Sequence, residues 1–270
     1  MHPLSDKVVL ITGGSSGIGR ATALRLAGHG ARVVVASRNA EALAETVAQA
    51  TALGAQAFAV PTDVTDPDQC QRAVETSVSH FGRLNVLLCS AGISMRAYFD
   101  GSDRAALERV MRVNFFGTMY ATYYALPHIK QTQGSLVAIS SLTGKRGIPS
   151  YAVYGASKFA IQGLYESLRL ELSRDGVHVG IVAPGFVDTP LRDQVLGPDG
   201  KPWPQPPSPP FRVWPVEKCV NRIVRLIIKR RAEVLIPWTS RPLLALDRLF
   251  GQWIGNAILK WKFPPEQSSQ

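Results

Sequence analysis

The sequence has few cysteines, no clustered histidines and no long apolar run. Its three cysteines are odd in number and far apart, so we expect neither a disulfide framework nor a zinc site, and a reducing compartment is indicated. The five histidines form no close-spaced ligand set, and there is no HExxH motif or carboxylate cluster. We therefore expect no metal ion. A membrane span is not expected either, because it needs about 20 consecutive apolar residues.

The net charge of +10 is concentrated towards the C-terminal end. Residues 211–262 contain eleven Lys or Arg and three acidic residues, a net charge of +8, so the remainder is nearly neutral. Such a region could meet phosphate, acidic lipid or only solvent. No DNA- or RNA-binding motif accompanies it, so no nucleic acid partner is expected. The first strand-like run begins at Lys7, which leaves no room for a signal or transit peptide, and the default expectation is a cytoplasmic protein.

Short apolar runs alternate with longer amphipathic stretches, which predicts one domain over residues 1–270 with a doubly wound α/β sheet. The runs are apolar on nearly every residue, as in parallel strands buried on both faces. They lie at 7–12, 31–37, 55–60, 85–90, 135–140 and 177–183. Helical patterns lie between them near 17–29, 39–53, 66–81, 103–131 and 150–174, with N-caps expected at Asp66, Ser102 and Ser150.

The alternation breaks after residue 183. The Pro-rich stretch 197–210 excludes regular helix or central strand, and two interpretations stay open. It is either a floppy insertion or, since long connections from a strand's carboxyl end lie over the ligand crevice, a lid. Beyond it we expect a basic helix at about 215–230, a strand at 233–237 and a last helix near 241–262.

A glycine-rich turn joins the first strand to the first helix. Gly13, Gly17 and Gly19 permit a tight turn, the approach of a pyrophosphate and close contact between helix and sheet. The N–H groups at the helix start, at the positive end of the helix dipole, then hold phosphates. The turn therefore predicts a nucleotide site.

The second strand ends at Ser37, Arg38 and Asn39, without an acidic side chain to accept hydrogen bonds from the ribose 2′-OH of NAD. Ser37 and Arg38 could instead meet a 2′-phosphate, which arginine binds strongly. Arg38 could also be a solvated residue at a helix start. The missing carboxylate favours NADP(H) over NAD(H).

The predicted helix 150–174 carries two tyrosines, Tyr151 and Tyr154, ahead of Lys158. Tyr154 and Lys158, four residues apart, share one helix face about 5–6 Å apart at Cβ, whereas Tyr151 is roughly 10 Å from Lys158 along the axis. A lysine ammonium there should lower the Tyr154 pKa from its ordinary value of about 10. Such a tyrosine can give a proton to an alkoxide or take one from an alcohol. Ser141 lies just past the fifth strand, at the ligand edge, whereas Ser140 should still belong to that strand.

The spacing Thr-Gly-x-x-x-Gly-x-Gly from Thr12 to Gly19, with Tyr154 and Lys158, resembles the short-chain dehydrogenase/reductase family over about residues 5–190. The resemblance implies a Rossmann fold and hydride transfer between a nicotinamide and a carbonyl carbon. It makes Tyr154 the general acid/base and Lys158 its pKa tuner and ribose anchor. It also makes Ser141 the partner of the carbonyl oxygen. Asn114 would bend its helix and help hold a proton-relay water.

The resemblance also assigns residues to the cofactor. Cys89 and Ser90 depart from the pattern, because they stand where the family usually has two asparagines, but Ala91 and Gly92 keep the small floor of the site. The implied cofactor-binding residues are Gly13, Ser15, Ser16, Gly17, Ile18, Gly19, Ser37, Arg38, Asn39, Asp63, Val64, Ala91, Gly92, Tyr154, Lys158, Pro184, Gly185, Val187 and Thr189.

In this family the segment after the sixth strand, here about 186–215, closes the substrate pocket. Its apolar residues suit a hydrophobic ketone or alcohol, with Ser141, Tyr151 and Phe186 as substrate contacts. Tyr151 could equally pack in the core. The family is usually dimeric or tetrameric through the helices near 103–131 and 150–174. The apolar lid residues are Phe186, Leu191, Val195, Leu196, Trp203, Phe211 and Trp214.

The basic extension at about 216–262 ends in an amphipathic stretch, 241–262, interrupted by Asp247 and Arg248. Its apolar face either covers the core or a subunit contact, or lies on a bilayer surface. The alternative to an enzyme is a protein of the same fold that senses the cofactor and catalyses no reaction. Such a protein would have no need of Ser141, Tyr154 and Lys158 together. The apolar positions are Leu246, Leu249, Phe250, Trp253, Ile254, Ala257, Ile258 and Trp261.

Overall fold

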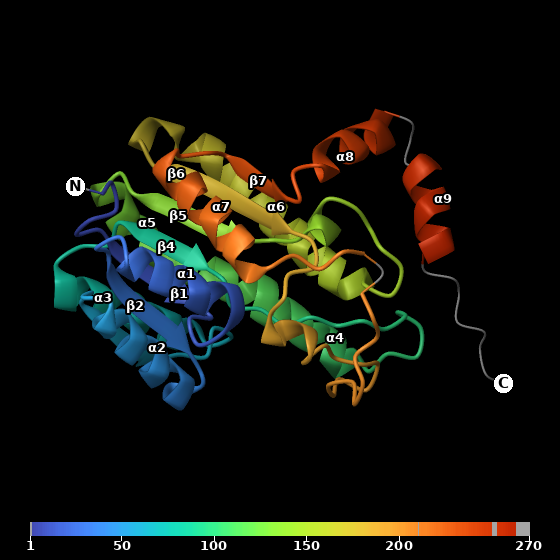
Figure 1. Ribbon diagram of the computed structural model, residues 1–270, viewed down its shortest axis with the longest axis horizontal. Helices are drawn as coiled ribbons and strands as arrows, with labels where there is room; N and C mark the ends of the chain where they lie inside the picture. Colours follow the sequence, from blue (N-terminus) through green and yellow to red (C-terminus); the bar gives the residue numbers. More distant parts are fainter. Residues whose placement is uncertain (1, 210, 250–252, 263–270) are drawn as a thin grey trace.

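A computed structural model describes residues 2–209, 211–249 and 253–262. Within them a parallel sheet has the strand order β3-β2-β1-β4-β5-β6-β7, which confirms the predicted doubly wound α/β fold (Figure 1). The strands are β1 (Val8–Thr12), β2 (Arg32–Ser37), β3 (Ala57–Pro61), β4 (Val86–Cys89), β5 (Ser135–Ile139), β6 (His178–Pro184) and β7 (Glu233–Ile236).

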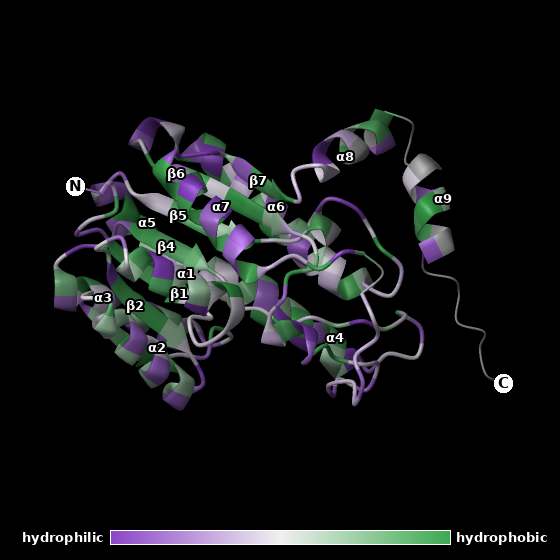
Figure 2. Cartoon of the chain, viewed as in Figure 1, coloured by the Kyte–Doolittle hydropathy of each residue, from purple (hydrophilic) through white to green (hydrophobic). Residues whose placement is uncertain are grey.

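Helices cover both faces of the sheet because successive strand residues point to opposite faces and nearly all are apolar. In β1, Val9 and Ile11 pack in one core and Val8 and Leu10 in the other. Figure 2 shows mainly hydrophobic strands between helices that carry both hydrophobic and hydrophilic residues. The first core is covered by α1 (Gly17–Ala27), α2 (Ala40–Ala52) and α7 (Val216–Ile228), the second by α3 (Pro67–Phe81), α5 (Gly117–Gln131) and α6 (Ala152–Glu171).

One of the three predicted helix caps is present. The Asp66 carboxylate accepts from the N–H groups of Asp68 and Gln69 at the start of α3. Ser102 is wrong, because its hydroxyl donates back to the Tyr98 carbonyl, and the next residue, Asp103, caps α4 (Arg104–Met111). Asp103 has the extended backbone of a helix cap, and its carboxylate accepts from the Ala106 N–H (2.8 Å).

Ser150 is also wrong as a cap, since it has a left-handed backbone (φ 60°) and the N-cap of α6 is the following residue, Tyr151. The predicted helix 103–131 is three pieces: α4, a π-helix η1 (Arg112–Phe116) and α5. Three short 3-10 turns are described elsewhere: η2 (Leu142–Gly144), η3 (Ser173–Asp175) and η4 (Pro190–Arg192).

The segment 186–215 is held by backbone hydrogen bonds at its base and at Leu196. Leu196 donates its N–H to the Ser94 carbonyl (2.9 Å), and Trp214 donates to the Phe186 carbonyl (2.8 Å). The first bond joins Leu196 to the loop after β4, and the second joins the two ends of the segment to each other. The role of this segment as a lid stays a prediction.

The single last helix predicted near 241–262 is wrong. The structure has α8 (Ser240–Leu249) and α9 (Trp253–Lys262), which run in different directions beyond β7 (Figure 1). Asp247 supplies a reason, because its Oδ1 accepts from the Gly255 N–H (2.8 Å), so the first turn of α9 packs against α8. A Cβ on Gly255 would overlap that carboxylate. Phe250, and the side chains of Trp253, Ile254 and Trp261, lie outside the described residues. Among the residues that the structure describes, none of the helices has the length and apolar composition of a membrane span.

Candidate active site

A cleft of about 590 Å³ lies at the carboxyl edge of the sheet, where the strand order reverses between β1 and β4. Segments far apart in the sequence line it, from the glycine turn to the lid. Eight predicted site residues do not line this cleft: Ser15, Gly19, Ser37, Arg38, Asn39, Asp63, Val64 and Asn114. The predicted residues that line it are Gly13, Ser16, Gly17, Ile18, Ala91, Gly92, Ser141, Tyr151, Tyr154, Lys158, Pro184, Gly185, Phe186, Val187 and Thr189.

The glycine turn is built by backbone contacts that a side chain would prevent. Gly13 has a φ of +70°, and a Cβ there would lie 2.7 Å from the Ala91 backbone. A Cβ on Gly19 would overlap the Gly13 carbonyl oxygen. The Ser16 side chain does not cap α1, which leaves the first N–H groups of this helix available to an anion. The turn therefore forms a cradle of the kind that holds a pyrophosphate.

At the end of β2, the three residues predicted to contact the cofactor differ in their surroundings. Asn39 caps α2 by accepting from the Ala42 N–H (3.0 Å). The Ser37 hydroxyl is buried and has no hydrogen-bond partner among the described residues, whereas Arg38 is exposed. A buried hydroxyl without a partner is costly, so this corner suits a further hydrogen-bonding group.

The residues after β3 support the edge of the site. Asp63 accepts from both the N–H (2.9 Å) and the hydroxyl (2.8 Å) of Thr65, which holds the turn. Val64 is buried, and a Cβ on Gly117 of α5 would meet its side chain at 2.6 Å. Close packing between this turn and α5 therefore fixes the position of Asp63 and Val64.

Ser141, Tyr154 and Lys158 come together at the floor of the cleft. Ser141 precedes η2, and its side chain hydrogen-bonds the Tyr154 hydroxyl while accepting from the Thr143 N–H (3.2 Å). Lys158, one turn after Tyr154 on α6, places its Nζ 5.7 Å from the centre of the Tyr154 ring and donates to the Ile139 carbonyl (3.1 Å). The predicted helical spacing therefore produces one cluster, with Tyr154 nearest the serine.

The predicted lowering of the Tyr154 pKa by Lys158 is wrong in this structure. Burial raises the Tyr154 pKa to about 12, opposed in part by the hydrogen bond with Ser141. Burial likewise lowers the Lys158 pKa to about 8. In both groups the cost of burying a charge dominates the pKa shift, so burial favours the neutral form of each.

Ser140 lies beyond β5, which ends at Ile139, so the expectation that it belongs to the strand is wrong. Its hydroxyl donates to the Lys158 carbonyl (3.0 Å) and accepts from the Gln162 amide (3.2 Å). Both partners are on α6. Ser140 thus anchors the helix that carries Tyr154, and Ser141 has the better position for a substrate oxygen.

Asn114 lies in the π-helix η1, fully buried. Its side-chain amide donates to the Ile93 carbonyl and to Ser157 Oγ (both 3.0 Å), and its Oδ1 accepts from the Ile93 N–H (2.8 Å). A Cβ on Gly92 would lie 3.1 Å from Asn114 Oδ1 and 3.6 Å from Lys158 Nζ. Asn114 therefore fixes the spacing between the loop after β4 and α6.

Thr12 is a supporting residue that the sequence did not single out for this role. Its hydroxyl accepts from the N–H groups of Ser90 (3.2 Å) and Ala91 (3.3 Å), which ties β1 to the loop after β4. Cys89, at one of the positions where asparagine was expected, is buried with its thiol 3.6 Å from the Tyr165 hydroxyl. The sequence shows a threonine at the end of the first strand, but only the fold shows that its hydroxyl meets the loop after β4.

Tyr151 combines the two alternatives left open for it. It is buried, its ring meets the Tyr154 ring edge-to-face at 6.1 Å, and it also lines the cleft. Of the predicted lid residues, Phe186, Leu191, Val195, Phe211 and Trp214 line the cleft. Leu196 instead packs with Met95, and the Trp203 indole donates to the Arg96 carbonyl (3.1 Å), so these two hold the lid in place.

A protein-family model described as short chain dehydrogenase matches residues 7–198. The chain belongs to the short-chain dehydrogenase family. This match spans β1 to the first part of the lid and includes the Ser141, Tyr154 and Lys158 cluster. The C-terminal helices α8 and α9 lie beyond the part of the chain that the family model covers.

Two plant relatives and one solved structure illustrate the family. The 11-beta-hydroxysteroid dehydrogenase 1A of Arabidopsis thaliana is 39% identical over 190 residues, which are 70% of this chain and 54% of that protein. Thus the match covers about half of that relative. The 11-beta-hydroxysteroid dehydrogenase-like 4A of the same plant is 34% identical over 248 residues, 91% of this chain and 81% of that one. A short chain dehydrogenase/reductase from Burkholderia phymatum, solved in complex with NAD, has a TM-score of 0.81 and 25% identity over 92% of this chain and 95% of that one.

Proposed function

We propose that this short-chain dehydrogenase interconverts a hydrophobic ketone and its secondary alcohol, with NADP(H) as cofactor. The observation that carries the proposal is the hydrogen-bonded pair of Ser141 and Tyr154 at the floor of a largely apolar cleft. Two neighbouring hydroxyl groups that bond to each other can both serve one carbonyl oxygen that becomes an alcohol. The cleft's glycine cradle and lid supply places for a dinucleotide and an apolar substrate on either side of this pair.

The residues present fit a nicotinamide dinucleotide. Gly13 and Gly17 keep the turn before α1 open, and the buried Ser37 hydroxyl beside Arg38 offers two groups to a 2′-phosphate. No carboxylate stands at the end of β2 to favour NAD, which supports NADP(H) as the preferred form. When bound, the nicotinamide supplies or accepts the hydride.

The protein's own groups manage the oxygen and the proton. Ser141 donates a hydrogen bond to the carbonyl oxygen and polarises it, and Tyr154 gives that oxygen its proton during reduction or takes it back during oxidation. The burial that raises the Tyr154 pKa keeps this proton in place until negative charge develops on the oxygen. Lys158 at 5.7 Å from the ring stabilises the tyrosinate left behind, and Asn114 positions the surrounding loop.

Replacement of Tyr154 tests the proposal directly. Tyr154→Phe should lower kcat with NADPH and an accepted ketone by about 10³-fold, since proton transfer typically contributes 10²- to 10⁴-fold. NADPH oxidation is followed at 340 nm across a panel of steroid, long-chain and aryl ketones. Tyr123→Phe, on an exposed ring of α5, is the matched control and should retain wild-type turnover. Near-wild-type turnover by Tyr154→Phe would refute the assigned mechanism.

A second role, docking on a membrane surface, is favoured by apolar side chains near the C-terminal end. Trp238 is 61% exposed and Leu249 is 79% exposed, in a region of net charge +8. Exposed apolar groups beside basic residues suit a bilayer with anionic headgroups. The predicted cytoplasmic location and homodimer or homotetramer are compatible with this role and stay predictions.

Vesicle flotation tests the docking role. The full chain should float with vesicles that contain phosphatidylserine, and the triple change Trp238→Ser, Leu246→Ser and Leu249→Ser should reduce the floating fraction at least fivefold. Leu53→Ser, on an exposed leucine at the end of α2, is the control. If the triple variant floats as well as the unaltered chain, this surface does not dock on membranes.

A further inference from the structure

Arg146 joins the loop that follows Ser141 to both C-terminal helices. Its Nε lies 3.1 Å from Oδ2 of Asp247 on α8, and both side chains are nearly buried, with exposed fractions of 12% and 7%. Its guanidinium also donates to the Asn256 side chain on α9. A buried ion pair resists separation, because removal of one partner leaves an unpaired charge. One arginine therefore holds α8 and α9 against the loop beside the reacting groups.

The same two helices supply leucines to the cleft wall. Leu244 on α8 and Leu259 on α9 line the cleft that holds the reacting groups. Each stands three positions from the residue that binds Arg146, which is Asp247 in α8 and Asn256 in α9. Positions three apart share one face of a helix. The contacts of Arg146 therefore also set where the two leucines lie in the wall.

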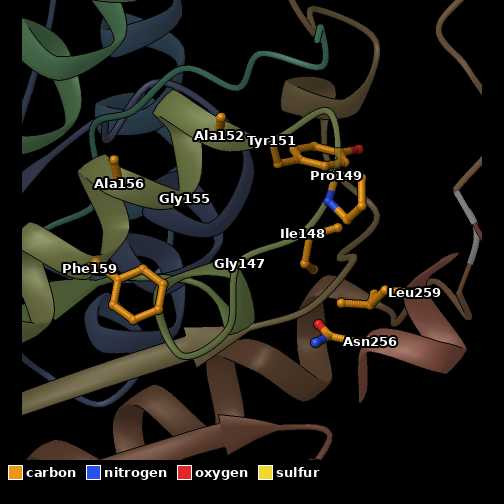
Figure 3. A pocket seen from close by; sticks show the side chains of 10 residues that line it. All are labelled: Gly147, Ile148, Pro149, Tyr151, Ala152, Gly155, Ala156, Phe159, Asn256 and Leu259. Carbon is orange, nitrogen blue, oxygen red and sulfur yellow. The ribbon is translucent and has the colours of Figure 1, made fainter. Parts of the chain in front are cut away.

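A thin partition closes the cleft on the side of α9. Figure 3 shows Ile148 pointing towards Leu259, and both residues line the cleft as well as a separate pocket of about 560 Å³ beside α6. Tyr151 also lines both cavities. Side chains that line two cavities lie between them, so the cleft ends at this partition.

The space inside the cleft is limited. Its volume of about 590 Å³ is shared, because Gly13 and Gly17 of the glycine turn line it together with the two leucines. A nicotinamide dinucleotide held at that turn would take part of this volume. A substrate is left with the remainder, so the size that fits depends on the position of Leu244 and Leu259.

We propose that Leu244 and Leu259 set the upper size limit of the substrate beyond its carbonyl group, with Arg146 and Asp247 as the positioning residues of this wall. The inference rests on the proposed function, because it concerns the ketone that is accepted at the same site. Both leucines lie beyond residue 198, where the match to the family model ends. A ligand that overfills a packed site forces side chains and backbone to shift, which weakens its binding.

Three aryl methyl ketones of increasing size test the inference: acetophenone, 2-acetonaphthone and 2-acetylanthracene. The measured quantity is the ratio of kcat/KM for 2-acetylanthracene to kcat/KM for acetophenone, with NADPH as cofactor. Leu244→Ala and Leu259→Ala should each raise this ratio about tenfold, because they enlarge the cleft. Leu244→Phe and Leu259→Phe should each lower it about tenfold. The ratio for 2-acetonaphthone should change in the same direction by a smaller factor.

Leu246→Ala and Ile258→Ala are the matched controls. These residues lie on the same two helices, are 46% and 36% exposed, and do not line the cleft. Both variants should keep the wild-type ratio. The inference is overturned if the ratio stays unchanged in the variants of Leu244 and Leu259. It is also overturned if alanine and phenylalanine move the ratio in the same direction, since that result would reflect a general loosening of the helices.

Asp247→Asn tests the positioning role. Loss of the carboxylate charge should release the wall and raise the same ratio, as the alanine variants do. In a chain that already carries Leu244→Ala and Leu259→Ala, Asp247→Asn should add little, because the side chains that it positions are gone. An equal rise in both backgrounds would contradict a role of Asp247 through these leucines.

Binding of an alcohol separates this inference from the proposed function. The probe is 1-(2-anthryl)ethanol with NADP⁺ present, followed by the anisotropy of its own fluorescence. Its Kd should be about tenfold lower in Leu244→Ala than in the wild type, and higher in Leu244→Phe. If the constants follow this order but no ketone is reduced, the proposed function fails and the size limit stands. If ketones are reduced but the three constants are equal, the size limit fails and the proposed function stands.

Discussion

The two ends of the cleft are held in different ways. At the cofactor end, backbone meets backbone: the carbonyl of Gly13 occupies the space where a Cβ of residue 19 would stand. At the outer end, α8 and α9 are tied by side chains, chiefly through Arg146, Asp247 and Asn256. Steric exclusion admits hardly any adjustment, whereas a side-chain tie can be released locally. We therefore expect the cofactor end of the cleft to be rigid and its outer end to adjust more readily.

The largest effect is expected from Gly19→Ala. The added methyl group would overlap the Gly13 carbonyl, and no rotamer change can relieve a backbone clash, so we expect a loss of about 2 kcal/mol or more in the free energy of unfolding. NADPH affinity should fall at least 100-fold, measured by fluorescence titration. Gly28→Ala is the control, because that position has φ −63° and its nearest neighbour at 3.6 Å. Equal behaviour of the two variants would contradict the steric account.

A smaller effect is expected from Arg38→Asp, which alters charge and leaves the turn intact. Removal of the guanidinium should weaken NADPH binding, and the new carboxylate should accept from the ribose hydroxyls of NADH. The ratio of the two dissociation constants should shift at least tenfold towards NADH. Arg104→Asp, at a side chain that is 90% exposed, serves as control. An unchanged ratio in Arg38→Asp would show that this residue does not select the cofactor.

The smallest effect on the whole protein is expected from Asp247→Asn. Loss of the carboxylate leaves the Arg146 guanidinium without its ionic partner, so amide hydrogen exchange in residues 240–262 should accelerate about tenfold. Exchange in β1 and β4 should not change. Asp6→Asn, which breaks the exposed pair with Arg32 at 3.3 Å, is the control and should leave residues 240–262 unaffected. Uniform acceleration across the sheet would mean that α8 and α9 are not a separable layer.

Local patterns were enough for most of the fold. Continuous apolar runs marked each strand, because a strand between two helix layers has no polar face to show. The errors fall where competing side chains decide: Asp103 displaces Ser102 as a helix cap, and Asp247 draws Gly255 back so that the last helix becomes two. Such competition depends on which polar group reaches an N–H first, and sequence spacing does not give that distance.

The candidate site divides in the same way. The spacing of Tyr154 and Lys158 on a helix, and of Ser141 at a strand's end, brought these residues together as predicted. The direction of the Tyr154 pKa shift could not be predicted from the spacing, because it depends on how deeply the hydroxyl is buried. Arg146 carried no signal of its own, since a single arginine in a loop gains meaning only from its partners.

The sequence by itself determined the parallel sheet, because continuous apolar runs mark its strands. It also determined the glycine turn and the order of the polar groups along the chain, because these depend only on which residues stand at which positions. Only the tertiary structure decided the outer wall of the cleft. Arg146 and Asn256 are more than 100 residues apart in the sequence. They meet, with Asp247, because α8 and α9 follow β7 at the edge of the sheet where the loop between Ser141 and Tyr154 lies. Contacts of that kind arise from the path of the whole chain, which no short stretch encodes.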